Sequence, residues 1–276
     1  MPILHAIVLG IVQGLTEFLP VSSSGHLLVV PWALGWNEFV SRPELKETFD
    51  VALHVGTFVA VAAYFRRDLS ELARAAWSSV RRRAIVGTEE RLAWLLVVAS
   101  LPAATVGFVL DSVIGDRNGG FAIIGLMLVV FGGVLFMADR VAGHRAAQQF
   151  SLRDALLMGG AQAIALQPGV SRSGATISMG RYLGFERDAA ARLSFLMAIP
   201  ITGGLGLYKG VKLFAIDGGL PPGFAAPFAW GTLTSAVTGF LVVSALLRLI
   251  RTRSFLPFVV YRVIAGAYVI GLAFAR

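Results

Sequence analysis

Two polar motifs interrupt an otherwise apolar chain, and both carry side chains that could do chemistry. The first extends from Gln13 to His26 and contains an acid, Glu17, four residues after Gln13. Positions four apart share one helix face, so the amide and the carboxyl group are expected to lie side by side. Pro20 ends that helix, and a run of serines opens the next one. The motif therefore predicts a carboxylate close to the start of a second helix.

Glu17 needs a partner if it lies inside a membrane. An isolated charge at that depth costs about 2.5 to 3.5 kcal/mol on insertion scales. Glu17 is therefore expected to be protonated, or to face a cation, a metal ion or a wet cavity. A glutamate whose only role is helix packing is the alternative interpretation.

Three serines, Ser22, Ser23 and Ser24, follow the proline turn, and His26 lies one helical turn beyond the first of them. Hydroxyl and N–H groups at a helix N-terminus attract phosphate, because the first-turn amides lack intrahelical acceptors and the dipole is positive there. Helix capping is the alternative role for these hydroxyls. His26 is a candidate base, acid or nucleophile near neutral pH, or an ordinary structural histidine.

The second motif extends from Gln162 to Thr176, and Arg172 is its only charged residue. The planar guanidinium group suits bidentate binding of phosphate, and Ser171, Ser173 and Thr176 add hydroxyls around another expected helix start. A serine turn whose arginine merely pairs with Glu17 is the alternative. The second motif therefore predicts an anion-binding helix start.

The two motifs resemble each other at a fixed offset of 149 positions. Six pairs of identical residues coincide, namely Gly10 with Gly159, Gln13 with Gln162, Val21 with Val170, Ser22 with Ser171, Ser24 with Ser173 and Gly25 with Gly174. The shared spacing Val-Ser-x-Ser-Gly indicates an internal repeat. Small residues are common at packed membrane helices, so coincidence and helix packing are the alternatives.

The elements that position these motifs belong to a membrane protein. The 276 residues are 56% hydrophobic and only 14% charged, with a mean hydropathy of +0.74, so polar side chains are too few to coat a soluble globule. The absence of cysteine excludes disulfides, thiolate metal sites and thiol nucleophiles. The net charge of +8 does not indicate nucleic-acid binding, because the arginines gather in short connections between apolar runs.

The distribution of basic residues predicts the orientation. Residues 66–91 hold seven Lys or Arg, and 140–153, 181–192 and 248–253 hold three each, whereas 36–48, 111–119 and 209–227 hold two, one and two. The positive-inside rule places the first set in the cytoplasm and the second outside. Six spans follow, at 49–65, 92–110, 121–138, 188–208, 231–247 and 256–274, and each is close to the roughly 20 residues that cross a bilayer.

Residues 153–180 begin and end beside cytoplasmic connections, so they are expected to form a re-entrant helical hairpin. A second hairpin is expected at 2–35, from a side that the sequence leaves open; entry from outside would make the two halves inverted repeats. The fold class is thus all-α polytopic membrane protein, with an inverted-topology repeat, six transmembrane helices and two re-entrant hairpins. One domain spans 1–276, with repeats at about 1–140 and 150–276. Both hairpin tips would meet at the midplane.

Other polar and aromatic residues receive simpler interpretations. His54 lies inside an apolar run, and the spacing of the residues around it suggests no partner, so it is assigned a structural role as a hydrogen-bonding residue. Trp32, Trp36, Trp94 and Trp230 lie near the ends of spans and are expected to anchor them at the membrane interface.

At these residues the chain resembles the bacterial undecaprenyl-pyrophosphate phosphatase family of the bacitracin-resistance type. The stretch from Gln13 to His26 is similar to the family's glutamate-rich first motif, and the stretch from Pro168 to Thr176 is similar to its second. Length and span pattern agree over essentially the whole chain. Gln13 stands where the family often has glutamate, although the family pattern admits glutamine, so Glu17 must carry the role of the acid.

The resemblance implies hydrolysis of undecaprenyl pyrophosphate to undecaprenyl phosphate and inorganic phosphate. This reaction recycles the lipid carrier of peptidoglycan synthesis in the bacterial inner membrane and confers bacitracin resistance. The resemblance also implies a divalent cation, Mg²⁺ or Ca²⁺, and a site that opens outward.

The mechanistic hypothesis assigns pyrophosphate binding to Arg172 and the helix-end amides, and the cation or the protons to Glu17. Ser23 or His26 attacks or activates water, with Ser22 and a directly attacking water as alternatives. The expected substrate contacts are Gln13, Ser22, Ser24, Ser171, Ser173 and Thr176.

Two other classes of function stay open. A lipid flippase or transporter would use the same inverted-repeat architecture and would move a head group or an ion without releasing phosphate. A lipid-binding scaffold would work without Glu17, His26 and Arg172. The sequence also leaves the oligomeric state open, with a homodimer among the alternatives, and membrane lipids are expected partners in every case.

Overall fold

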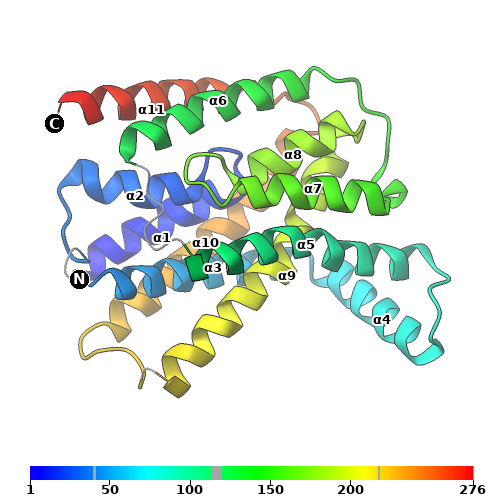
Figure 1. Ribbon diagram of the computed structural model, residues 1–276, viewed down its shortest axis with the longest axis horizontal. Coiled ribbons are helices and arrows are strands. Elements are labelled where there is room, and N and C mark those ends of the chain that lie inside the picture. Colours follow the sequence, from blue (N-terminus) through cyan, green and yellow to red (C-terminus); the bar gives the residue numbers. More distant parts are fainter. Residues whose placement is uncertain (40–41, 114–119, 217, 276) are drawn as a thin grey trace.

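The computed structural model describes residues 1–39, 42–113, 120–216 and 218–275, and within these ranges its regular elements are all helices (Figure 1). In chain order they are α1 (Ile3–Phe18), α2 (Ser23–Leu34), α3 (Pro43–Tyr64), α4 (Arg66–Arg82), α5 (Thr88–Val113), α6 (Phe121–Asp139), the 3-10 helix η1 (Ala147–Gln149), α7 (Leu152–Ile164), α8 (Arg172–Tyr182), α9 (Arg187–Val211), the π-helix η2 (Lys212–Ile216), α10 (Ala225–Leu249) and α11 (Leu256–Ala275). The predicted all-α class is confirmed.

Five of the described helices, α5, α6, α9, α10 and α11, are long and apolar enough to cross a membrane. α3 meets the same criterion only together with α4, and the two helices meet at an angle of 84°. The chain is therefore a polytopic membrane protein with five such helices, or six when the bent pair counts as one span. The predicted outer connection 111–119 lies largely outside the described residues.

The expected cytoplasmic connection at 66–91 contains a helix, α4, that hydropathy alone did not reveal. Its sequence is strongly charged, and Leu72 and Ser79 are its buried side chains. The Ser79 hydroxyl accepts a hydrogen bond of 2.9 Å from Trp94 Nε1 on α5, and Asp68 pairs with Arg192 of α9 at 2.7 Å. Helix α4 is thus amphipathic and held against α5 and α9 by its polar side chains.

Two pairs of short helices, α1–α2 and α7–α8, contain the polar motifs. Each pair is interrupted before a serine that caps the second helix: Ser22 with φ of 77° and Ser171 with φ of 75°. Ser22 Oγ accepts from Gly25 N at 3.4 Å, and Ser171 Oγ accepts from Gly174 N at 3.1 Å. The left-handed backbone at a non-glycine residue is uncommon, so its occurrence at both breaks marks them as similar turns.

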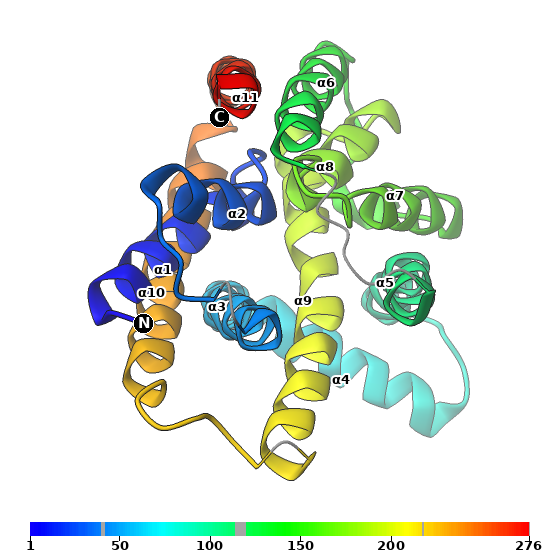
Figure 2. The same ribbon diagram turned by 60° about the vertical axis from the view of Figure 1, so that its left-hand side comes forward.

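The first helix of each pair lies against a long helix. Helix α1 lies beside α10, and α7 lies beside α5 (Figure 2). The approach of α1 to α10 requires glycine, because a Cβ atom on Gly14 would lie 2.8 Å from Ser235 O. Helices α6 and α11 also pack together, and a Cβ atom on Gly125 would lie 2.7 Å from Gly266 O. Close backbone contact thus fixes the helices around the motifs.

A polar cluster outside the long apolar helices anchors the start of α7. Arg145 binds both carboxylate oxygens of Asp154, at 3.1 and 2.6 Å, and its guanidinium group lies over the Phe185 ring. Ser151 N and Oγ also donate to Asp154 at 2.9 and 2.7 Å, which completes a capping box. Burial alone would raise the pKa of Asp154, but the hydrogen bonds from Arg145 and Ser151 outweigh it and hold this pKa below its usual range.

Candidate active site

Glu17 is the centre of a buried polar cluster. It lies on the last turn of α1, is 6% exposed, and shares its helix face with Gln13, whose Nε2 donates to Glu17 Oε2 at 3.1 Å. Arg172 Nη2 donates to Glu17 Oε1 at 2.9 Å. The predicted contact across one helical turn and the predicted cation for the buried acid are both present.

Ser23 is the hydroxyl that contacts this acid. Its Oγ donates to Glu17 Oε2 at 2.6 Å, and the residue is 8% exposed at the first position of α2. The turn at Ser22 reverses the chain between the two helices and brings Ser23 back over the end of α1. A hydroxyl that donates to a carboxylate is the arrangement of a nucleophile with its base.

The two motifs meet directly, as the sequence predicted. Besides the pairing of Arg172 with Glu17, Gly169 N donates to Ser22 Oγ at 3.1 Å, and Ser173 Oγ donates to Leu19 O at 3.0 Å. These contacts join residues about 150 positions apart. They set the start of α8 beside the break between α1 and α2. Ser23 and Arg172, the first residues of α2 and α8, both contact Glu17.

Several residues that are predicted to contact the substrate also make hydrogen bonds within the protein. Ser22 and Ser171 are the N-caps described above, which is the capping alternative. Thr176 Oγ1 donates to Arg172 O at 2.8 Å and lies 2.6 Å from Ser194 Oγ. Ser24, which is only partly buried, has its hydroxyl 3.4 Å from that of Ser22 and is the less constrained hydroxyl of the first motif.

His26 does not join Glu17 and Arg172, contrary to the arrangement expected from the sequence. Its Nδ1 lies 2.7 Å from Ser22 O, and its Nε2 lies 2.6 Å from the Tyr261 hydroxyl of α11. The reason is the direction of its side chain, which leaves α2 toward α11 instead of toward α1. A mainly apolar cavity of about 290 Å³ begins there, lined by α2, α6 and α11.

Three residues near this site were not predicted. His54 Nε2 lies 3.6 Å from Glu17 Oε2, although its Nδ1 also makes the structural bond that the sequence suggested, to Asp50 O at 2.7 Å. Ser194 O accepts from Arg172 Nη1 at 3.3 Å. Arg262 lies completely buried behind both helix starts. His54 and Arg262 carried a usable signal, because an ionisable side chain within an apolar span is functional by default.

The cluster contains one buried oxygen that is a candidate ligand for a divalent cation. Because a carboxylate can only accept, the bond to Glu17 fixes the orientation of the Gln13 amide and leaves its Oε1 as the amide's acceptor. That oxygen is buried and accepts no hydrogen bond in the part of the chain that the structure describes. Mg²⁺ and Ca²⁺ bind such oxygens together with phosphate oxygens. Within the described residues no three acidic, histidine or cysteine side chains form a complete metal site, so a ligand would have to contribute oxygens.

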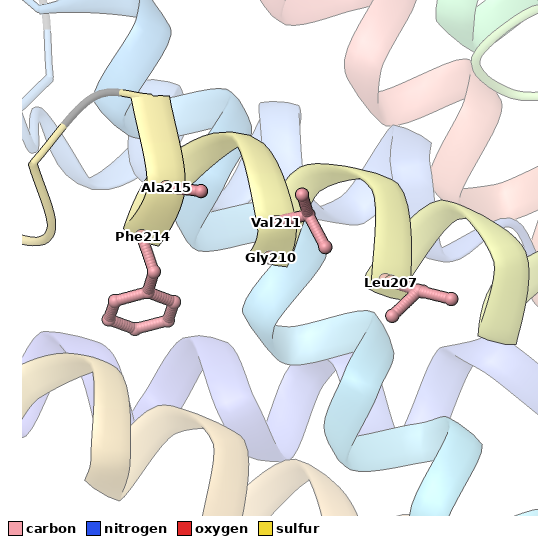
Figure 3. A pocket seen from close by; sticks show the side chains of 6 residues that line it. Leu207, Gly210, Val211, Phe214 and Ala215 are labelled. Carbon is pink, nitrogen blue, oxygen red and sulfur yellow. The ribbon is translucent and has the colours of Figure 1, made fainter.

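A second hollow, of about 490 Å³, lies at the far end of α9 and is not this site. Figure 3 shows Leu207, Val211 and Phe214 projecting from α9 and η2 beside it. Its lining contains only apolar residues, without a hydroxyl, an acid or a base. The cluster around Glu17 is therefore a better candidate for phosphate chemistry than this hollow.

Comparisons with known proteins identify the family to which the chain belongs. Residues 6–268 match the family described as bacitracin resistance protein BacA. The chain is 46% identical over 278 residues to an undecaprenyl-diphosphatase of Geobacter sulfurreducens, with full coverage of both chains. It is 45% identical over 274 residues to one of Pelobacter propionicus, covering 99% of this chain and 97% of that protein. One of Thermomicrobium roseum is 43% identical over 286 residues, again with full coverage. The chain therefore belongs to the bacitracin resistance protein BacA family.

Proposed function

We propose that this chain is a membrane phosphatase that hydrolyses undecaprenyl pyrophosphate to undecaprenyl phosphate and inorganic phosphate. The observation that carries the proposal is the contact of 2.6 Å between Ser23 Oγ and Glu17 Oε2, beside the guanidinium group of Arg172. Relatives that align over the full chain bear the name undecaprenyl-diphosphatase. The product is the lipid carrier of peptidoglycan synthesis, and its regeneration would confer resistance to bacitracin.

The first chemical step is attack of Ser23 Oγ on the terminal phosphorus. The serine proton passes to Glu17, and the bond from that phosphorus to the bridging oxygen breaks. Its electron pair leaves with undecaprenyl phosphate, which is a stable anion and needs no proton. Arg172 and the first-turn amides of α2 and α8 would stabilise the negative charge on the transferring group, because a guanidinium group and helix N-terminal N–H groups attract phosphate oxygens.

The second step releases phosphate. Water attacks the phosphorus of phosphoserine, and Glu17 returns its proton to the departing Ser23 Oγ. One water proton stays on the inorganic phosphate and the other is released to solvent. His54, beside the same carboxylate oxygen, is placed to assist this exchange of protons.

Glu17 and Gln13 would hold a divalent cation, Mg²⁺ or Ca²⁺, with the help of pyrophosphate oxygens. Such an ion supplies neutralisation of negative charge on the phosphates. The need for it follows from the charges at the site, because Arg172 already shares its positive charge with Glu17. The unpartnered Gln13 oxygen supports this part of the proposal.

The prenyl chain would enter the cavity between α2, α6 and α11. His26, Val29, Val30 and Ala33 line it from one face of α2, and Tyr261 lines it from α11. Because α2 begins at the phosphate site, a lipid with its head group at Ser23 would run along that face. A homodimer stays a prediction of the sequence, to be checked by the mass of the purified protein in detergent.

The proposed topology is an inverted repeat with six spans and two re-entrant hairpins, in the inner membrane of a bacterium. The supporting observation is a constant offset of 149 positions, because α1 and α7 begin at Ile3 and Leu152, and α2 and α8 begin at Ser23 and Arg172. We infer from the family resemblance that the site opens on the outer side.

The test is phosphate release from undecaprenyl pyrophosphate by the purified protein in detergent, with and without a chelator. The proposal predicts release that stops with the chelator and resumes with Mg²⁺ or Ca²⁺. Detergent removes the two compartments that transport needs, so a flippase would release nothing. Absence of phosphate, together with lipid movement in sealed vesicles, would replace the proposal with transport.

A further inference from the structure

Arg262 is a completely buried arginine in the middle of α11. It forms no ion pair among the described residues, and its guanidinium group donates only to backbone carbonyl groups. The acceptors are Leu128 O at 3.1 Å, Pro20 O at 2.9 Å, Gly169 O at 2.9 Å, Val170 O at 3.0 Å and Met127 O at 3.3 Å. A buried cation of this kind is retained against a substantial desolvation cost.

The acceptors of Arg262 come from both breaks and from the neighbouring helix α6. Pro20 lies in the break between α1 and α2, whereas Gly169 and Val170 lie in the break between α7 and α8. The guanidinium group also approaches the first turn of α8, because a Cβ atom on Gly174 would lie 3.1 Å from Arg262 Nη1. One side chain therefore contacts both breaks behind the site.

The polarity of a broken helix explains what these contacts do. A break exposes carbonyl oxygens, which repel an anion, as well as amide hydrogens, which attract it. Arg262 binds the carbonyl groups just before the Ser22 and Ser171 caps. The first-turn amides of Ser23 and Arg172 lack intrahelical acceptors, and the side chains of both residues contact Glu17.

Helix α11 is itself well fixed, so it can hold the breaks. The Tyr261 hydroxyl, next to Arg262, contacts His26 Nε2 at 2.6 Å. One turn further along, Gly266 packs on Gly125 so closely that a Cβ atom would lie 2.6 Å from Gly125 O. The guanidinium group is thus carried by an element anchored to both α2 and α6.

We propose that Arg262 is a positioning residue of the phosphatase. It holds the two breaks so that Ser23, Arg172 and the amides of α2 and α8 converge on one pyrophosphate. The expected effect of Arg262 on the rate rests on the proposed function. Its expected effect on the two breaks rests on geometry alone. Arg262 does not touch the substrate in this account.

The test compares Arg262→Lys and Arg262→Gln with Arg248→Lys and Arg248→Gln, which alter an exposed arginine at the end of α10. Lysine keeps the positive charge but not the planar guanidinium group, so Arg262→Lys should lower kcat about 10-fold. Arg262→Gln should lower kcat about 100-fold. Both effects are expected because small misplacements of reacting groups lower the rate strongly. The KM should change less than kcat. Rates are normalised to the monodisperse folded fraction.

Amide hydrogen exchange distinguishes a local effect of Arg262 on the two breaks from a general loss of stability. Residues 19–25 and 168–174 should both exchange faster in the Arg262 variants, while α4 and α5 keep the rate of the wild type. Uniformly faster exchange, or kcat within twofold of the wild type in Arg262→Gln, would overturn the inference. If the wild type itself releases no phosphate, the proposed function fails, and the exchange at the two breaks still decides whether Arg262 holds them.

Discussion

Glu17 illustrates what a polar residue in an apolar stretch reveals from sequence alone. Its spacing from Gln13 predicts their contact, because four residues make one helical turn, and its burial predicts a cation such as Arg172. The direction of a neighbouring side chain was harder to predict. His26 follows Ser23 by three residues, yet it points to Tyr261 on a helix 235 positions away. Such a partner has no signal in local spacing.

Gln13 provides the residue-scale prediction. Gln13→Ala removes the one buried oxygen of the cluster that accepts no hydrogen bond in the described structure. We expect the Mg²⁺ concentration for half-maximal phosphate release to rise about 10-fold or more, because a ligand oxygen is lost. The measurement is rate against free Mg²⁺, with the exposed Gln148→Ala as the matched control. An unchanged Mg²⁺ requirement in Gln13→Ala would remove this residue from the cation site.

At the scale of elements, hydropathy locates the long helices well. The predicted span 121–138 corresponds to α6 (Phe121–Asp139), and 256–274 corresponds to α11 (Leu256–Ala275). Hydropathy did not predict helix α4, because its apolar face is narrow and its many charged residues lower the mean hydropathy of the window. The breaks themselves were predicted from Pro20 and the serine runs, but their left-handed caps at Ser22 and Ser171 were not.

The start of α7 provides the prediction for an element. Asp154 has a lowered pKa in the folded protein, relative to its ordinary value of 3.8, so its ionised form stabilises the fold. That contribution is complete above the unfolded pKa and is lost as the pH falls through the lower, folded pKa. The melting temperature of the wild type should therefore exceed that of Asp154→Asn at pH 6, and the gap should narrow below about pH 4. A gap that stays constant down to pH 2 would contradict this assignment.

At the scale of the whole molecule, the repeat in sequence predicts that two distant motifs form one site, and their contacts across about 150 positions agree. The role of α11 could not be predicted in this way. Arg262 has no counterpart in the motif comparison, and its carbonyl acceptors depend on how α6, α11 and the two breaks pack together.

The proposed topology predicts which connections face outward. The chain contains no cysteine, so a single cysteine can be placed at will. Asn37→Cys, after α2, should react in intact cells with a maleimide that cannot cross membranes, whereas Gln148→Cys should react only after lysis. Both positions are exposed. Labelling of both from the same side would contradict the inverted arrangement of the two hairpins.

The central claim is that Ser23, with Glu17 as its base, transfers the terminal phosphoryl group. The most direct measurement is the single-turnover rate of phosphate release from undecaprenyl pyrophosphate by Ser23→Ala, with Ser70→Ala on α4 as the matched serine control. The account predicts a loss of at least about 10³-fold for Ser23→Ala and a wild-type rate for Ser70→Ala. A Ser23→Ala rate within 10-fold of the wild type would contradict it and would leave attack to another group.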